Sequence, residues 1–212
     1  VSGVYEYPSS LNADSGVDTT TCFAISEEQI CLREVTRLCN FGAIERVADC
    51  EGQFLSSFFM IKKSSGGWRF ILNLKRLNNF IVASYFKLED WKTVIRLLSS
   101  HDFLATIDLQ DAYFLVPIAY EDRRFLRFRF QNQLFQFRVL PFGLASAPYI
   151  FTKILKPVVS TFRERGFLSI VYLDDFLLIA FSYQKCLSDI IFSIVLGFII
   201  NNHKSALIPA KS

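Results

Sequence analysis

Two adjacent acids, Asp174 and Asp175, interrupt an otherwise apolar run over residues 171–179. The segments on either side, 169–173 and 176–180, each have the composition of a buried strand, and their two-residue separation is typical of a β-hairpin. We therefore expect the pair at a turn, at one end of a sheet. Two carboxylates ~5 Å apart repel by roughly 3 kcal/mol at an effective dielectric constant of about 20, and a hard divalent cation is their natural partner. A solvated Asp-Asp turn is the alternative.

A third acid, Asp108, ends a predicted strand over residues 103–109. If that strand lies beside the hairpin, three carboxylates converge. Three acids from two strands are what a two-metal phosphoryl-transfer site needs, because two ions roughly 3.5–4 Å apart activate a 3′-hydroxyl and stabilise the leaving pyrophosphate. The expected cofactor is a pair of Mg²⁺ ions, for which Mn²⁺ can substitute.

The elements around these acids follow a mixed α and β order without repeats. Residues 1–25 are predicted to be a loose lead-in. Strands are predicted over 54–63 and 68–74, joined by a flexible loop, and a short strand-like run ends at Ile200 and leads to Lys204. Four helices are predicted. The first follows the Ser26/Gln29 capping box and ends at Gly42, and the second begins at Glu89 and Asp90. The third runs from Ser146 to Gly166 with a kink at Pro157, and the fourth follows the carboxylate hairpin and ends at about Leu196. The apolar faces expected for the first and third helices are Ile30, Val35 and Leu38, and Ile150, Phe151, Ile154, Val158 and Phe162.

A second predicted hairpin, over 125–130 and 134–140, alternates in character. Leu126, Phe128 and Phe130 fall on one face, and Arg127 and Arg129 fall on the other. This pattern predicts a basic surface backed by aromatic rings, which suits contact with a nucleic-acid backbone. A half-buried hairpin with a solvated face is the alternative.

The chain has 212 residues, of which 51% are hydrophobic and 20% are charged, so it can bury a core. The simplest prediction is one domain with sub-lobes. The charge is unevenly spread. Residues 1–60 carry three Lys/Arg against nine Asp/Glu, a net charge of −6, whereas residues 61–212 carry twenty against eleven, a net charge of +9. A basic body suits a polyanionic partner, although such charges also simply solvate helices.

Five cysteines without a C-x-x-C pair, and only two histidines, argue against a zinc site. Free thiols indicate a reducing compartment, so an intracellular location, cytoplasmic or nuclear, is expected. The apolar stretch Ile190 to Ile200 is too short to span a bilayer, and no membrane anchor is predicted. The chain starts with neither Met nor a signal pattern, so we expect a piece of a longer protein.

Three motifs in order along residues 30–210 closely resemble the palm motifs of reverse transcriptases. They are Asp108-x-x-x-Ala112-Tyr113, Leu140-Pro141-Phe142-Gly143-Leu144-x-x-Ala147-Pro148-x-x-Phe151 and Tyr172-Leu173-Asp174-Asp175. Phe142, where retroviral enzymes usually carry Gln, points toward gypsy-like and DIRS-like retrotransposons. The segments 69–78 and 86–89 look most like the DIRS type.

The resemblance implies an α+β fold: a right-hand polymerase with fingers and palm, an antiparallel palm sheet packed on helices, and the thumb absent. It implies a fingers-like portion over 26–100 with part of 115–145, and a palm over 101–212 that stops before the primer grip. The implied activity is RNA- or DNA-templated DNA synthesis by a retrotransposon enzyme from dNTPs and a DNA primer. The implied partners include the thumb and RNase H portions of a larger polyprotein.

Site residues follow from matched motif positions. Asp108, Asp174 and Asp175 resemble the catalytic metal-binding triad, with Asp108 and Asp174 as direct ligands. Tyr113 resembles the aromatic gate that excludes a ribose 2′-hydroxyl. The remaining positions are dNTP-binding (Lys63, for which Lys62 could substitute, Arg69, Asp111, Ala112, Phe142, Gly143 and Lys204) or nucleic-acid-binding (Arg127, Arg129 and Tyr172).

Two other readings of the chain stay open. After Asp175 the chain is ~4 residues shorter than expected for the family, about one helical turn. That shortening, with the early stop, favours a degenerate fragment that retains only nucleic-acid binding. A palm polymerase that copies RNA into RNA is the other alternative, and Tyr113 disfavours it.

Overall fold

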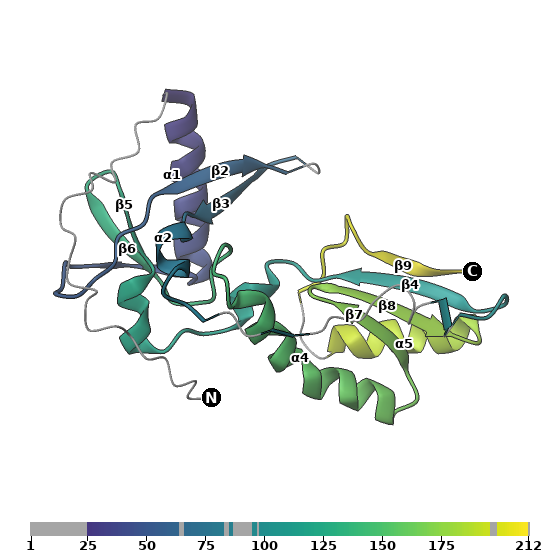
Figure 1. Ribbon diagram of the computed structural model, residues 1–212. Coiled ribbons are helices and arrows are strands. Elements are labelled where there is room, and N and C mark those ends of the chain that lie inside the picture. The colour runs from purple at the N-terminus through teal and green to yellow at the C-terminus, as the bar shows by residue number, and fades with distance from the viewer. Residues whose placement is uncertain are drawn as a thin grey trace. The chain divides into compact units, whose positions relative to one another are not determined.

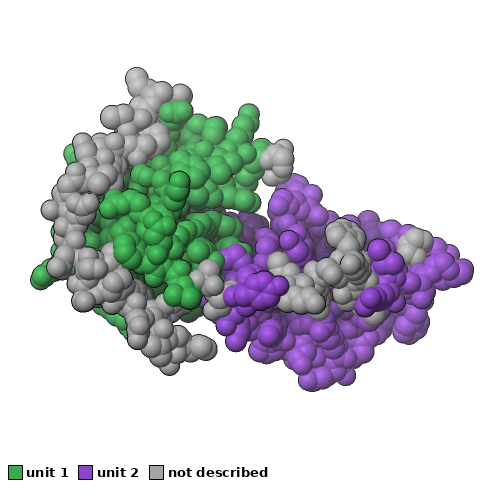
Figure 2. Space-filling view, in the orientation of Figure 1, with its two compact units in different colours: residues 1–83, 113–147 green, residues 84–112, 148–212 purple. Residues whose placement is uncertain are grey.

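The computed structural model describes residues 25–63, 66–82, 85–86, 95–96, 98–195 and 199–211. The chain forms two compact units, of which unit 1 comprises residues 1–83 and 113–147 and unit 2 comprises residues 84–112 and 148–212 (Figure 2). The predicted lead-in (apart from Ile25) and the predicted helix start at Glu89 and Asp90 lie outside the described residues. No helix in the described part of the chain is long and apolar enough to cross a bilayer. Among the cysteines that the structure describes, the free thiols are Cys31, Cys39, Cys50 and Cys186.

Unit 1 contains two antiparallel sheets and a long helix, α1 (Figure 1). One sheet has the strand order β1-β6-β5, and the other is the β2-β3 hairpin. The bounds of the elements are α1 Ile25–Phe41, β1 Ile44–Val47, β2 Phe58–Lys62, β3 Trp68–Leu72, α2 Lys75–Asn78, η2 Tyr120–Phe125, β5 Arg127–Phe130 and β6 Gln133–Phe137. A further short turn of 3-10 helix, η1, spans Ala112–Leu115.

Helix α1 buries Val35 and Leu38 as predicted, together with Cys31, whereas Ile30 is only half-buried. It begins at Ile25, so Ser26 lies inside the helix and not before it, contrary to the capping-box prediction. Its end follows the sequence closely. Gly42 has φ +77, and its N–H and that of Ala43 donate to the carbonyls of Cys39 and Leu38, both at 2.9 Å.

Aromatic rings build the core of unit 1. Phe58 of β2 stacks on Phe70 of β3 with ring centroids 4.6 Å apart, and Phe70 lies 4.9 Å from Phe128 of β5. Phe128 in turn stacks on Phe135 of β6 at 5.5 Å. The apolar face predicted for the second hairpin therefore joins the two sheets through side-chain packing.

Unit 2 is a four-stranded antiparallel sheet with the order β7-β8-β4-β9, and two helices lie on one of its faces (Figure 1). The strands are β4 Phe103–Asp108, β7 Leu168–Tyr172, β8 Asp175–Ala180 and β9 Ala206–Lys211, and the helices are α4 Ala147–Glu164 and α5 Tyr183–Val195. Phe162 of α4 packs against Phe176 of β8 and Phe192 of α5, at 6.2 and 5.8 Å between ring centroids. This packing fixes the helices on the sheet that carries the three acids.

Three sequence predictions for unit 2 were wrong in detail. Of the run ending at Ile200, the structure describes residues 199 and 200, where Ile200 forms an isolated bridge with Leu109; the strand described in this region is β9. Leu155 is buried in α4 while Ile154 is 48% exposed, so the apolar face is rotated relative to the prediction. The hairpin turn between β7 and β8 consists of Leu173 and Asp174, not of the two acids.

Candidate active site

The pairing of β4 with β8 brings the acids together. The antiparallel register places Asp108 directly opposite Asp175, and Asp174 precedes Asp175 in the turn. Leu173 adopts φ +55, which lets a two-residue turn close the hairpin. The N–H of Leu109 donates to the carbonyl of Asp174 at 3.0 Å, so the turn is tied to the end of β4. The sequence prediction that the three acids meet at one end of a sheet is thus confirmed.

A turn over residues 201–205 closes the other side of Asp108. The N–H of Asp108 donates to Ser205 Oγ, and the N–H of Asn201 donates to the Asp108 carbonyl, both at 2.9 Å. These bonds hold Lys204 so that its Nζ lies 3.3 Å from Asp108 Oδ2. Lys204 was predicted as a site residue, whereas Asn201 and Ser205 were not. The Asn201-x-x-Lys204 spacing signals a turn, but it cannot show which strand that turn will meet.

The electrostatics of this cluster reflect crowding of like charges. Partial burial raises the pKa of Asp175 above its ordinary value, and the neighbouring carboxylates of Asp174 and Asp108 raise it further. Lys204 acts in the opposite direction. Asp108 is 8% exposed, so its charge is largely withdrawn from water and depends on Lys204 for neutralisation. The site therefore has an excess of negative charge that one lysine does not remove.

Carboxylate oxygens are the ligands that Mg²⁺ and Mn²⁺ prefer, and the register of β4 and β8 sets Asp108 opposite Asp175, beside Asp174. Their chemistry therefore fits a hard divalent cation. Among the residues that the structure describes, however, no three His, Cys, Asp or Glu side chains are arranged as a ready ligand set. Lys204 holds Asp108 Oδ2 in this arrangement, so side-chain adjustment has to accompany cation binding.

A second cluster lies in unit 1 and is centred on Phe142. Its ring centroid is 5.2 Å from that of Tyr113 and 5.5 Å from that of Phe114. The guanidinium carbon of Arg69, on β3, lies 5.2 Å from the Phe142 ring centroid, which is a cation–π contact. Three predicted nucleotide-binding residues, Arg69, Tyr113 and Phe142, therefore lie together although they are far apart in the sequence.

The backbone after Phe142 is held tightly. Gly143 has φ +101, and a Cβ added there would lie 2.9 Å from the carbonyl oxygen of Leu72, so glycine is required on two grounds. Asn78, at the end of α2, donates from Nδ2 to the Gly143 carbonyl and accepts the N–H of Ala145 at Oδ1, both at 2.9 Å. Asn78 was not among the predicted site residues, although it ends the segment 69–78 that looks most like the DIRS type.

The remaining predicted site residues lie at strand ends or at the start of η1. Lys63 follows β2 at the loop end of the β2–β3 hairpin, where its N–H donates to Gly67. Asp111 has φ +48 and precedes the buried Ala112 at the start of η1. Tyr172 ends β7 opposite Asp175 and is 52% exposed.

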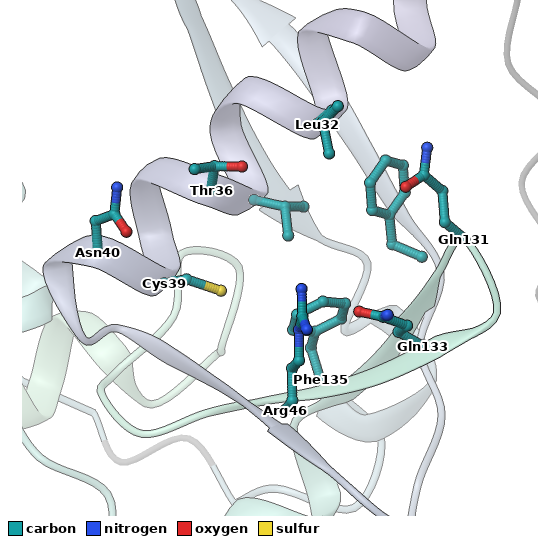
Figure 3. A pocket seen from close by; sticks show the side chains of 10 residues that line it. Leu32, Thr36, Cys39, Asn40, Arg46, Gln131, Gln133 and Phe135 are labelled. Carbon is teal, nitrogen blue, oxygen red and sulfur yellow. The ribbon is translucent and has the colours of Figure 1, made fainter.

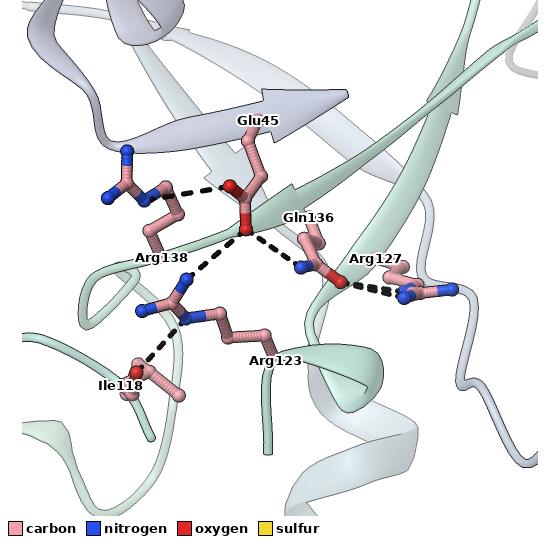
Figure 4. A network of polar contacts seen from close by, with 6 residues as sticks. All are labelled: Glu45, Ile118, Arg123, Arg127, Gln136 and Arg138. Atoms are coloured by element: carbon pink, nitrogen blue, oxygen red, sulfur yellow. Dashed lines mark hydrogen bonds and ion pairs between the residues drawn. The ribbon is translucent and has the colours of Figure 1, made fainter. Parts of the chain in front are cut away.

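The prediction of a basic surface on the second hairpin was wrong for Arg127. Its side chain is buried, and its Nε and Nη2 donate to Gln136 Oε1 (Figure 4). Its Nη1 donates to Gln53 and to the carbonyl of Ala48. The physical reason is that the segment after β1 lies against Arg127, where the Ala48 carbonyl and the Gln53 side chain accept from its guanidinium. Arg129 reaches solvent in part and pairs with Asp49.

Glu45 of β1 completes this network, because it accepts hydrogen bonds from Arg123 and Gln136 and pairs with Arg138 (Figure 4).

A cavity of about 220 Å³ also occurs in unit 1, and it lies between α1 and the β5–β6 hairpin (Figure 3). Its lining includes Thr36, Cys39, Asn40, Arg46 and Phe135, none of which is a predicted site residue. The network and the cavity thus belong to the framework of unit 1.

Several known proteins are similar to this chain. A family model described as "Reverse transcriptase (RNA-dependent DNA polymerase)" matches residues 61–211. The genome polyprotein of Petunia vein clearing virus (isolate Hohn) is 29% identical over 71% of this chain, which corresponds to 7% of the polyprotein. The transposon Tf2-3 polyprotein of Schizosaccharomyces pombe is 24% identical over 56% of this chain and 9% of the polyprotein.

A solved structure of the foamy viral protease-reverse transcriptase in complex with double-stranded DNA has a similar fold, with a TM-score of 0.74 at 20% identity. The similarity covers 89% of this chain and 33% of the foamy viral chain. The chain therefore spans less than a tenth of the two polyproteins and a third of the solved enzyme. The family model covers most of the chain, and the chain belongs to the reverse transcriptase (RNA-dependent DNA polymerase) family.

Proposed function

We propose that this chain is the fingers and palm portion of a retroelement DNA polymerase, which adds nucleotides from dNTPs to a primer 3′-hydroxyl on an RNA or DNA template. In this proposal unit 1 is the fingers and unit 2 is the palm. The observation that carries the proposal is the register of β4 and β8, which sets Asp108 opposite Asp175 beside Asp174. Three acids at one sheet end serve no evident packing role, because like charges repel one another and Asp108 is also buried.

Asp108, Asp174 and Asp175 would hold the divalent cations. When bound, such cations lower the pKa of an attacking hydroxyl and neutralise charge on a leaving pyrophosphate. The carboxylates themselves keep the excess negative charge at the sheet end. The burial of Asp108 makes that charge more effective than it would be in water, since the interaction energy rises as the effective dielectric constant falls.

Lys204 has a role of its own in this proposal. One of its three N–H donors faces Asp108 Oδ2, which leaves two donors that suit phosphate oxygens. The bonds from Asn201 and to Ser205 fix the turn that carries this ammonium group. We infer that Lys204 orients the triphosphate and balances the charge of Asp108 in the absence of nucleotide.

The Phe142 cluster is proposed to bind the incoming nucleotide. Arg69 stacks over Phe142 with its guanidinium, and a stacked guanidinium keeps edge N–H donors available for phosphate oxygens. The ring of Tyr113 beside Phe142 is proposed to exclude a ribose 2′-hydroxyl by steric contact. Lys63 is proposed as a further triphosphate contact, with Asp111 and Ala112 as pocket residues. Tyr172 and Arg129 are proposed as contacts to the primer and template.

The test is template-directed primer extension by a chain that carries these residues with its native downstream sequence. Labelled DNA primer is annealed to RNA or to DNA template, and dNTPs are supplied with Mg²⁺. The proposal expects extension that depends on template, on dNTPs and on the divalent cation. Absence of extension on both templates, by a folded protein, contradicts it.

A second candidate function is nucleic-acid binding by a polymerase-derived fragment without catalysis. The observation that favours it is the contact of Lys204 with Asp108, together with the absence of a ready ligand set among the described residues. Binding of primer–template without extension, and without any effect of Mg²⁺ on Tm, is the outcome that this alternative expects.

A further inference from the structure

The carboxamide of Asn78 joins two segments that are 65 residues apart in the sequence. Its Nδ2 donates to the carbonyl of Gly143, and its Oδ1 accepts the N–H of Ala145. The two bonds use one donor and one acceptor of a planar group, so they fix both the position and the orientation of the turn. Carboxamides with both ends engaged in this way act as rigid links, because a rotation that keeps one bond breaks the other.

Other contacts also restrict the conformation of the turn over residues 141–145. Gly143 already lies so close to β3 that a Cβ would be 2.9 Å from the Leu72 carbonyl oxygen. Phe142, immediately before it, contacts Tyr113 on one side and carries the Arg69 guanidinium over its ring. The Asn78 carboxamide thus holds the backbone immediately after Phe142, whose ring contacts Tyr113, Phe114 and Arg69.

We propose that Asn78 is a positioning residue for nucleotide binding: it fixes the 141–145 turn and thereby the surface that Phe142 and Gly143 present. This inference rests on the proposed function, because it assumes that the Phe142 cluster of unit 1 binds the incoming nucleotide. Loss of the link lets Phe142 shift relative to Tyr113 and Arg69, which weakens dNTP binding. The acids of unit 2 are unchanged by the substitution, so the turnover of bound nucleotide is little affected.

Two variants and one control separate this role from general stability. Asn78→Ala removes both bonds. Asn78→Asp keeps an acceptor for the Ala145 N–H, but it loses the donor and places a carboxylate against the Gly143 carbonyl. Asn79→Ala is the matched control, because Asn79 is the exposed residue next in sequence. The readouts are KM for dNTP and kcat in primer extension, Tm, and hydrogen exchange at the Ala145 amide.

We expect both Asn78 variants to raise KM by about 10-fold, equivalent to about 1.4 kcal/mol, while kcat changes by less than about 3-fold. The Ala145 amide should exchange faster in Asn78→Ala than in Asn78→Asp, and Asn79→Ala should match the wild type throughout. An unchanged KM in both variants overturns the inference and leaves the proposed function intact. A parallel fall of kcat and Tm without a specific rise in KM also overturns it, because that pattern describes a merely structural residue. If the wild type and the control both fail to incorporate dNTPs, the proposed function itself fails and the inference with it.

Discussion

Asp108 and Asp175 occupy directly opposed positions on the antiparallel strands β4 and β8. Asp174 precedes Asp175 in the turn, and Lys204 is the cation that contacts Asp108, at 3.3 Å. Sheet register therefore concentrates negative charge at one strand end. The predictions below follow from this relationship, from the Phe142 cluster and from the burial of Arg127.

Mg²⁺ or Mn²⁺ should stabilise the folded protein, because a ligand that binds only the native state adds to the free energy of unfolding. At a cation concentration about ten times Kd, the added free energy is about 1.4 kcal/mol, which corresponds to a rise in Tm of about 3–6 °C. Asp108→Asn and Asp174→Asn should lose most of this rise. Thermal melts with and without the cation measure it.

The control for these melts is Glu164→Gln, which neutralises an exposed acid in the same unit. The glutamine retains an oxygen acceptor for Ser160, which bonds Glu164 in the native protein. The control should show the full rise in Tm. An equal rise in all variants would mean that the cation binds elsewhere.

Stability should fall as pH rises through the titration of Asp175. The pKa of this carboxyl is raised in the folded state by partial burial and by Asp174 and Asp108. Between the unfolded and the folded pKa the native state binds more protons than the unfolded state, so the free energy of unfolding decreases with increasing pH. Asp175→Asn removes this contribution.

Urea midpoints of the wild type and Asp175→Asn, measured from about pH 4 to 7, check the sign. The variant should gain stability relative to the wild type as the pH rises. Burial also raises the pKa of Asp189. This residue is present in both proteins, so its contribution to the pH dependence of stability cancels in the difference. A difference that moves in the opposite direction contradicts the crowding of carboxylates.

Tyr113→Val should relax sugar selection. The ring of Tyr113 packs beside Phe142, and a smaller side chain leaves space for a 2′-hydroxyl. The ratio of kcat/KM for dCTP to that for rCTP should fall by at least about 10-fold, while dCTP use changes less, because relief of a steric clash affects the excluded substrate. Tyr113→Phe keeps the ring and is the matched control. An unchanged ratio in Tyr113→Val would assign the residue to packing alone.

Arg127 and Arg129 should behave differently although they share one face of a strand. Arg127→Met removes the donors to the buried Gln136 Oε1 and to the less buried oxygens of Gln53 and Ala48, and it should cost about 2–3 kcal/mol of stability. Arg129→Gln removes an ion pair at the surface and should cost less than about 1 kcal/mol. Chemical denaturation compares the two, and similar costs would contradict the burial of Arg127.

Local sequence signals predicted much of the framework. The strands that bear Asp108 and flank Asp174 have apolar runs of strand length, and Gly42 and Gly166 mark the ends of α1 and α4 through positive φ angles. Glycine at such positions reflects a backbone requirement that sequence carries directly. The resemblance then identified which acids would meet, and the register of β4 and β8 agrees.

Features that depend on which segment covers a strand in the folded protein could not be predicted from local sequence signals. Alternation placed Arg127 and Arg129 on one face, but only the contacts of Arg127 with Ala48 and Gln53, in the segment after β1, show that Arg127 is covered. Strand β9 escaped detection because Pro209 interrupts its pattern, and proline lacks the N–H of a regular strand. The turn at Leu173 and Asp174 was misplaced by one residue because positive φ at Leu173 has no sequence signal.

Primer extension by Asp174→Asn, in a chain with its native downstream sequence, tests the central claim most directly. The substitution keeps the size of the side chain and removes one charge from the acid cluster. The account predicts a loss of at least about 100-fold in the extension rate at saturating dNTP, with primer–template binding retained. Glu164→Gln should extend at the wild-type rate. Extension by Asp174→Asn close to that of the wild type would contradict the assignment of these carboxylates to the polymerase site.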